Sequence, residues 1–364
     1  MKNDKSDQNF LALTGVRAIA AYMVFCHHYT GSCSTGILLS FVKEFYTGVT
    51  IFFVLSGFLI YYKYSESATL EKGFLINYFK NRFARIYPVY FLIVVFSAIL
   101  IYNPAGGNLT NQLLLLLLQL TFVRGFFDAY KFIGVGQGWT LTVEESFYSF
   151  FPFLISIIKK WGFVSTLLGV YLIGAILTGI GALINFHGFF YPLQFVMNYT
   201  FFGQVAEFFF GMYLAKIILA KSVQQKSTRF PKFTFIGLFG VIAGIFLMSR
   251  FEETCTYGTF YWQGTIVNCL VLPIFITTLF YGLIREGSLI QKFLGSKIMV
   301  FLGKTSYAFY LIHVGLLQFI FEKYISVNPF IIFILMNLFA IGIYMAIEEP
   351  LRKYIRKIKV TAQA

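Results

Sequence analysis

The chain has 364 residues, of which 58% are apolar, 20% aromatic and only 12% charged. A soluble domain could not bury so much apolar surface, so this composition predicts a polytopic membrane protein. The formal net charge is +14, but the Lys and Arg residues fall mostly between apolar runs, where they indicate topology. We therefore expect no nucleic-acid partner.

The apolar runs predict an all-α protein with about ten membrane-spanning helices, because each span needs roughly 20 mostly apolar residues. The first run contains Arg17 and is not followed by a small-residue cleavage pattern, so we expect a retained span. The runs leave no room for a separate globular domain, so residues 1–364 are predicted to form a single integral membrane domain. The predicted spans are 10–31, 45–62, 86–103, 139–158, 161–184, 198–219, 234–249, 262–284, 305–322 and 329–349.

The run 111–123 is apolar but short, and its length is typical of a re-entrant helix. If this run does not cross the membrane, the basic segments of the chain all lie on the same side as the N-terminus. The positive-inside rule then predicts that both termini are cytoplasmic. A cysteine introduced at Ser227 should accordingly react only with reagents that reach the cytoplasm.

Two ionisable residues share one face of the first predicted span. Arg17 and His28 are eleven residues apart, which is about 20° beyond three full turns and about 16 Å along a helix. His27 points about 80° away from Arg17. Arg at the centre of a span costs ~2.5 kcal/mol or more, which favours a polar cavity and a function. The alternative is that Arg17 snorkels to lipid headgroups while His28 lies in the interface.

The next two spans carry a small-residue pair and a basic cluster. Ser56 and Gly57 permit close helix packing, and this packing alone explains them. Arg82 and Arg85, at the start of the third span, are neighbours on one helical face and suit a phosphate-rich ligand. Anchoring of the span by positive charge explains the arginines equally well.

Carboxylates and a third histidine enter later spans. Glu144 and Glu145 lie in a predicted span, close in sequence to Trp139 and Tyr148, and carboxylates at that depth need a partner such as Arg or a protonated His. His313 lies about 12 Å inside its span. A lone buried His is more often a hydrogen-bonded structural residue than a catalyst.

The four cysteines have no metal-type spacing, so we expect no metal site. Cys26 and Cys269 lie in apolar runs and behave as small hydrophobes. Cys33 and Cys255 fall in predicted outer loops, where an oxidising compartment would permit a disulfide.

Taken together, these motifs resemble acyltransferase family three, the integral membrane acyltransferases. Arg17 and His28 match the Arg, ten residues, His pattern of the family's first span. The resemblance continues in order through "IFFVLSGFLI", "RFARIYPVY", "WTLTVEESFYSFFP", "TSYAFYLIH" and "IEEPLRKY". We expect no appended serine-hydrolase-like domain of the sort that some members carry.

The resemblance implies acyl transfer, usually of acetyl, from cytoplasmic acyl-CoA to a hydroxyl of a carbohydrate or lipid-linked acceptor, commonly at the outer face. It implies that His28 is catalytic, that Arg17 supports it, and that Arg82 and Arg85 serve the use of acyl-CoA. The expected donor is acetyl-CoA without a metal, and the expected location is a bacterial cell membrane with its lipids.

The chemistry agrees with that implication. The enzyme must orient an activated thioester, deprotonate an acceptor hydroxyl and stabilise an oxyanion. His28 could be the base, its basicity tuned by Glu144 or Glu145, or it could carry the acyl group itself. Arg17 could bind a CoA phosphate or hold the site's polar network. The alternative function is a transporter or flippase of a polysaccharide or its precursor, in which these residues and His313 would line a proton or substrate pathway.

Overall fold

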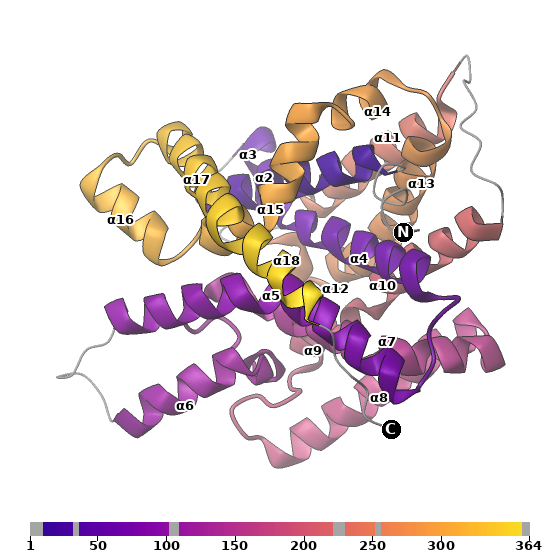
Figure 1. The fold of residues 1–364 in the computed structure, drawn as a ribbon, viewed down its shortest axis with the longest axis horizontal. Coiled ribbons are helices and arrows are strands. Elements are labelled where there is room, and N and C mark those ends of the chain that lie inside the picture. Colours follow the sequence, from indigo (N-terminus) through magenta and orange to yellow (C-terminus); the bar gives the residue numbers. More distant parts are fainter. Residues whose placement is uncertain (1–9, 32–35, 102–108, 221–229, 252–255, 359–364) are drawn as a thin grey trace. The chain divides into compact units, whose positions relative to one another are not determined.

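The computed structural model describes residues 10–31, 36–101, 109–220, 230–251 and 256–358. Within these ranges the chain is helical and has no strand, as the coiled ribbons of Figure 1 show. Extended backbone pairs there only in one isolated antiparallel bridge, between Phe127 and Phe189. The predicted all-α class is therefore confirmed.

The chain divides into two compact units, and each unit is built from two separate stretches. The first unit contains residues 1–65 and 204–307, and the second contains residues 66–203 and 308–364. The expected single domain stays a prediction, and each unit is described by itself.

The first unit holds the N-terminal helices together with those that follow Gln204. Its α-helices are α2 (Leu11–Tyr29), α3 (Ile37–Lys43), α4 (Gly48–Tyr64), most of α10 (Phe201–Ala220), α11 (Lys232–Met248), α12 (Trp262–Ile266), α13 (Leu272–Arg285), α14 (Leu289–Leu294) and most of α15 (Lys297–Ile312). The unit also contains two 3₁₀ turns, η1 (Glu44–Thr47) and η4 (Gly258–Phe260), and one π-helical turn, η5 (Val267–Val271).

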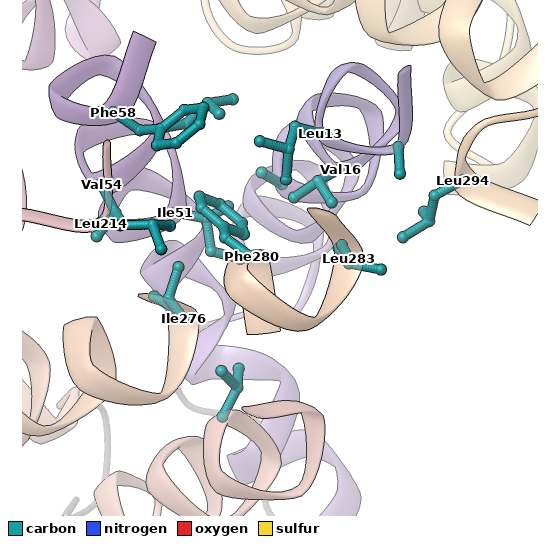
Figure 2. Packing of buried hydrophobic residues seen from close by; sticks show 14 of the residues in the cluster. Leu13, Val16, Ile51, Val54, Phe58, Leu214, Ile276, Phe280, Leu283 and Leu294 are labelled. Atoms are coloured by element: carbon teal, nitrogen blue, oxygen red, sulfur yellow. The ribbon is translucent and has the colours of Figure 1, made fainter. Parts of the chain in front are cut away.

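An apolar core joins several helices of the first unit. Figure 2 shows Leu13 and Val16 of α2 near Val54 and Phe58 of α4 and Phe280 of α13. Because lipid is as apolar as these side chains, close packing and not expulsion of water drives such helix association. The core therefore depends on how closely the helices approach.

The closest approach of α4 to α10 uses one glycine from each helix. A Cβ atom on Gly57 would lie 2.1 Å from the Phe208 carbonyl oxygen, and one on Gly211 would lie 2.0 Å from the Val54 carbonyl oxygen. Neither position can accept a larger residue unless the backbone moves. The Ser56-Gly57 pair thus lies at a tight helix crossing, with Ser56 itself buried.

The second unit contains the longest helix, α5 (Lys72–Ile101), and the helices that surround it. The others are α6 (Leu109–Leu120), α7 (Trp139–Trp161), α8 (Phe163–Ile184), α9 (Leu193–Tyr199), α16 (Leu316–Tyr324), α17 (Pro329–Ile343) and α18 (Glu349–Lys357). Short turns are η2 (Val123–Phe126), η3 (Gly136–Gly138) and the π-helical turn η6 (Tyr344–Glu348).

Eight helical segments among the described residues are long and apolar enough to cross a membrane. Each overlaps a predicted span, although the segment from Lys72 to Leu100 begins well before the predicted 86–103. The predicted span 305–322 is the pair α15 and α16, which is bent by 84° at the break, and 234–249 is the shorter helix α11. The run 111–123 corresponds largely to the short helix α6. An integral membrane protein is thus supported, while the number of ten spans and the cytoplasmic termini stay predictions.

Three residues of the sequence predictions lie outside the described residues. They are Ser227, the proposed labelling site, and the two outer-loop cysteines Cys33 and Cys255.

Candidate functional site

In the first unit, one unbroken helix carries both residues of the Arg17–His28 pair. Helix α2 runs from Leu11 to Tyr29, so Arg17 lies in its first half and His28 in its last turn. Arg17 is half-buried, whereas His28 is exposed. The end of α2 therefore presents an imidazole at the surface of the first unit.

His27 has a different environment from its neighbour His28. Its Nδ1 lies 2.5 Å from the carbonyl oxygen of Lys43, the last residue of α3. Its ring packs at centroid distances of 5.4 Å from Tyr46 and 5.0 Å from Tyr257. The His28 ring lies edge-on to it, with centroids 4.8 Å apart and an interplanar angle of 69°.

A buried carboxylate fixes the loop that brings Tyr257 to this cluster. Glu44 of η1 has 0% exposure, and its Oε1 accepts a hydrogen bond of 2.8 Å from the Gly258 N–H. Burial, and secondly the Glu44 carboxylate, raise the pKa of the Tyr257 phenol above its usual value. Tyr257 therefore keeps its proton, and its neutral ring packs against His27.

In the second unit, α5 and α7 bring the arginines and carboxylates together. The Arg82 guanidinium carbon lies 5.4 Å from the centre of the Tyr148 ring, and the Tyr148 hydroxyl donates to the Glu144 carboxylate. Arg85 also acts electrostatically on Tyr148, and Arg82 on Glu145. The arginines that were assigned to a donor and the carboxylates that needed a partner thus form one polar network.

The residues of this network differ in their exposure to solvent. Arg82 is only 5% exposed, and Tyr148 only 1%. Arg85, Glu144 and Glu145 are half-buried. Of the two arginines, Arg85 is therefore the more accessible to a ligand.

Helix α15 adds a second polar chain to the same unit. The Tyr310 hydroxyl lies 2.9 Å from the Thr140 hydroxyl of α7. His313, with 0% exposure, places Nδ1 2.7 Å from the Tyr310 carbonyl oxygen and stacks on Phe309. This geometry matches the structural reading of His313 better than the catalytic one.

The remaining predicted residues have packing roles. Trp139 begins α7 and lies edge-on to Tyr199, with centroids 4.9 Å apart. Ser56 lies in the first unit at the crossing of α4 and α10. His28 and the two glutamates belong to different units, so their pairing stays a prediction.

Sequence reasoning missed several buried charged residues, among them Glu207, Arg124 and Glu286. Glu207 of α10 is fully buried, and its Oε1 lies 3.4 Å from the Thr50 hydroxyl, which donates to Asn268 at 2.9 Å. Arg124 is 1% exposed and donates to the carbonyls of Ile133 and Val135. The sequence did contain a signal for each of these two residues. Glu207 is a single acidic residue inside an apolar run, and Arg124 is a basic residue in a predicted outer loop.

The third of these residues stabilises a helix start. Glu286 follows α13, and its carboxylate accepts hydrogen bonds from the backbone N–H groups of Phe233 and Thr234 at the start of α11. Such a contact satisfies helix N–H groups that have no partner within the helix.

Comparison with known families identifies the architecture. The model of the family described as "Acyltransferase domain" matches residues 10–349, a range that includes α2, the α5–α7 network and α15. The chain belongs to this family. The resemblance noted from the motifs is therefore confirmed.

Curated relatives of this acyltransferase-family chain come from Staphylococcus aureus. O-acetyltransferase OatA of strain NCTC 8325 / PS 47 is 28% identical over 370 residues, and OatA of strain COL matches equally. A protein of strain COL with the provisional O-acetyltransferase name SACOL0978 is 25% identical over 368 residues.

These alignments cover 94% of the chain but only 57% of each relative. The chain therefore spans little more than half the length of these curated relatives. No solved structure matches it.

Proposed function

We propose that the protein is a membrane-bound O-acyltransferase that moves an acyl group, in the simplest case acetyl, from cytoplasmic acyl-CoA to an acceptor hydroxyl. The acceptor is a carbohydrate or a lipid-linked glycan at the outer face of a bacterial cell membrane. The observation that carries the proposal is the family match over residues 10–349, which includes the Arg17–His28 pair on α2. The O-acetyltransferase names of the relatives support the choice of oxygen as the acceptor atom.

The reaction needs a base, an activated acyl group and charge stabilisation. In this scheme His28 removes the proton of the acceptor hydroxyl while that oxygen attacks the thioester carbonyl. The new C–O ester bond forms, the C–S bond of the thioester breaks, and the CoA thiolate takes up a proton. The exposure of His28 at the end of α2 supports this role, because a base must reach a substrate hydroxyl.

The other polar residues are assigned to the donor and to support. Arg85 of the α5–α7 network would bind CoA phosphates through charge-assisted hydrogen bonds. Arg17 of α2 is assigned separately, to donor binding or to support of His28. Arg82 would hold α5 against Tyr148 of α7, whose hydroxyl donates to Glu144, and so fix the direction of Arg85.

A transporter or flippase is the second candidate, because one helix pair is broken. Discontinuous helices line substrate sites in many transporters, and α15 and α16 meet at 84° beside the buried His313. Under this alternative the same ionisable residues would conduct a proton or a substrate, and no ester would form.

Acetyl transfer by membranes that carry the full chain separates the two functions. Membranes are incubated with radiolabelled acetyl-CoA and a panel of polysaccharides, cell-wall fragments and lipid-linked sugars. We expect base-labile label in one acceptor class with wild type, and ~10²–10⁴-fold slower labelling with His28→Ala at equal expression. Movement of a glycan across vesicles without any use of acetyl-CoA would replace this proposal by the transporter.

A further inference from the structure

The cluster around His27 is the most completely defined contact set next to the proposed base. Four aromatic or imidazole rings meet there, contributed by three separate segments of the first unit: the end of α2, η1 and the residue before η4. The spacing along the helix places His27 on a different face from Arg17 and His28, so the sequence did not include His27 in the site. Its contacts in the structure indicate a different role.

One hydrogen bond fixes the rotation of the His27 ring. A backbone carbonyl oxygen can only accept, so Nδ1 of His27 carries the hydrogen and donates it to Lys43. Lys43 is 2% exposed and ends α3, so the acceptor is itself held in place. The ring therefore cannot turn about its χ2 bond without losing this bond.

Two tyrosines hold the same ring from the sides. The ring centroids of Tyr46 and Tyr257 lie 6.1 Å apart. They lie 5.4 Å and 5.0 Å, respectively, from the ring centroid of His27. The bond from Gly258 to the buried Glu44 connects the Tyr257 segment to η1, from which Tyr46 also projects. His27 is thus the fixed member of the histidine pair.

His28 by contrast is exposed, and one of its ring contacts is the edge-to-face contact with His27. An imidazole at the last turn of a helix has several rotamers open to it unless a neighbour selects one. Selecting a rotamer in advance lowers the cost of reaching the reactive geometry, because the base must lie within hydrogen-bond reach of the hydroxyl.

We infer that His27 is a positioning residue that holds the His28 ring in its working orientation, with Lys43, Tyr46 and Tyr257 fixing His27 in turn. The inference rests on the proposed acyl transfer, in which His28 is the base. His27 itself touches neither substrate nor donor in this role.

Three substitutions at one position separate the parts of this role. His27→Phe keeps the ring for Tyr46, Tyr257 and His28 but cannot donate to Lys43. His27→Asn keeps a donor near the Nδ1 position but loses the ring. Each is expected to lower kcat for acetyl transfer about 10-fold, and His27→Ala about 100-fold, while the KM for acetyl-CoA stays within about 2-fold of wild type. The matched control is His187→Asn, in the second unit, which should keep wild-type kcat.

A double-mutant cycle with His28→Ala distinguishes positioning from stability. If His27 acts through His28, His27→Phe lowers kcat about 10-fold in wild type and has no effect on the residual transfer of His28→Ala. Thermal midpoints in detergent should be equal for wild type and His27→Phe.

Two results would overturn the inference in an active wild-type enzyme. One is wild-type kcat in His27→Phe and His27→Asn, and the other is an equal fold-loss in both backgrounds of the cycle. Absence of acetyl transfer by wild type would instead refute the proposed function, so the two failures are distinct.

Discussion

The two units use ionisable side chains in opposite ways. In the first unit, His28 is exposed at the end of α2 and rests on a fixed neighbour. In the second unit, the Arg82 guanidinium of α5 lies over the Tyr148 ring of α7, and the Tyr148 hydroxyl donates to Glu144 of the same helix, with Arg82 and Tyr148 almost fully shielded. Under the proposed function, the first cluster would reach a reactant, whereas the second would chiefly hold α5 against α7 and direct one accessible arginine.

The largest effect is expected from the exposed imidazole. His28→Ala should lower acyl transfer by the ~10²–10⁴ usual for a general base, because no other group would take the acceptor proton. Binding of acetyl-CoA should stay near wild type, whereas Arg17→Ala should lose donor binding or stability first. Transfer rates and equilibrium donor binding, measured side by side on the same preparations, provide the check. A His28→Ala enzyme with wild-type activity would mean that His28 is not the base and that the exposed cluster of the first unit does not reach the reactant.

The two arginines of α5 should differ from each other. Arg82→Ala removes a shielded cation from the face of the Tyr148 ring and should destabilise the protein by about 2 kcal/mol or more, the value for a desolvated cation–π contact. Arg85→Ala should leave stability nearly unchanged and weaken acetyl-CoA binding by ~1.5–3 kcal/mol. If the contact of Arg85 is bidentate, Arg85→Lys will not restore binding. Detergent thermal midpoints and donor affinity are measured for all three, and equal behaviour of the two arginines would contradict the assignment.

A packing change in the first unit should have a smaller effect. Gly211→Ala places a Cβ atom 2.0 Å from the Val54 carbonyl oxygen, so α4 and α10 must separate at a cost of roughly 1–3 kcal/mol. The control is Gly169→Ala in α8, where no atom other than those of the adjacent residues and the helix's own backbone lies within 4 Å of the added Cβ. Thermal midpoints should fall for Gly211→Ala alone, and an unchanged midpoint would mean that the crossing is looser than described.

The smallest effect is expected where the second unit uses a neutral hydrogen bond. Tyr310→Phe removes the hydroxyl that lies 2.9 Å from Thr140 and should cost about 0.5–1.5 kcal/mol. Tyr148→Phe removes a bond to a carboxylate and should cost more, about 1.5–3 kcal/mol. Unfolding measured under identical conditions ranks the two, and the reverse order would show that Glu144 does not depend on Tyr148.

The sequence predicted helix positions well because apolar runs and spans have the same length. The prediction of helix ends failed where tertiary contacts extend a helix into a polar part of the sequence. Helix α5 begins at Lys72 although the apolar run begins near residue 86. The packing of α18 against α5, with the bond from Lys80 to the Ile358 carbonyl oxygen, supports that polar half.

The break between α15 and α16 has a local backbone cause that the hydropathy of the sequence does not predict. Gly315 has a φ of 102°, a conformation that only glycine adopts at low cost, and it precedes the first residue of α16. Hydropathy across 305–322 is continuous, so it predicted one span. The candidate site residues could be selected from the sequence, since each is an ionisable group inside or next to an apolar run, and their roles stay predictions. The contact of Arg82 with Tyr148 could not be predicted, because it depends on how α5 and α7 cross.

The π-helical turn η5 bears on how this chain tolerates changes in length. A turn closed by i→i+5 hydrogen bonds holds one residue more than an α-helical turn, so Val267–Val271 stores a one-residue insertion inside an otherwise α-helical segment. Deleting one residue there would let α12 and α13 continue as a single α-helix. The same deletion would rotate the preceding residues by about 100° and draw Asn268 away from Thr50. The extra residue thus directs the Asn268 amide toward Thr50, beside the buried Glu207 carboxyl of the first unit.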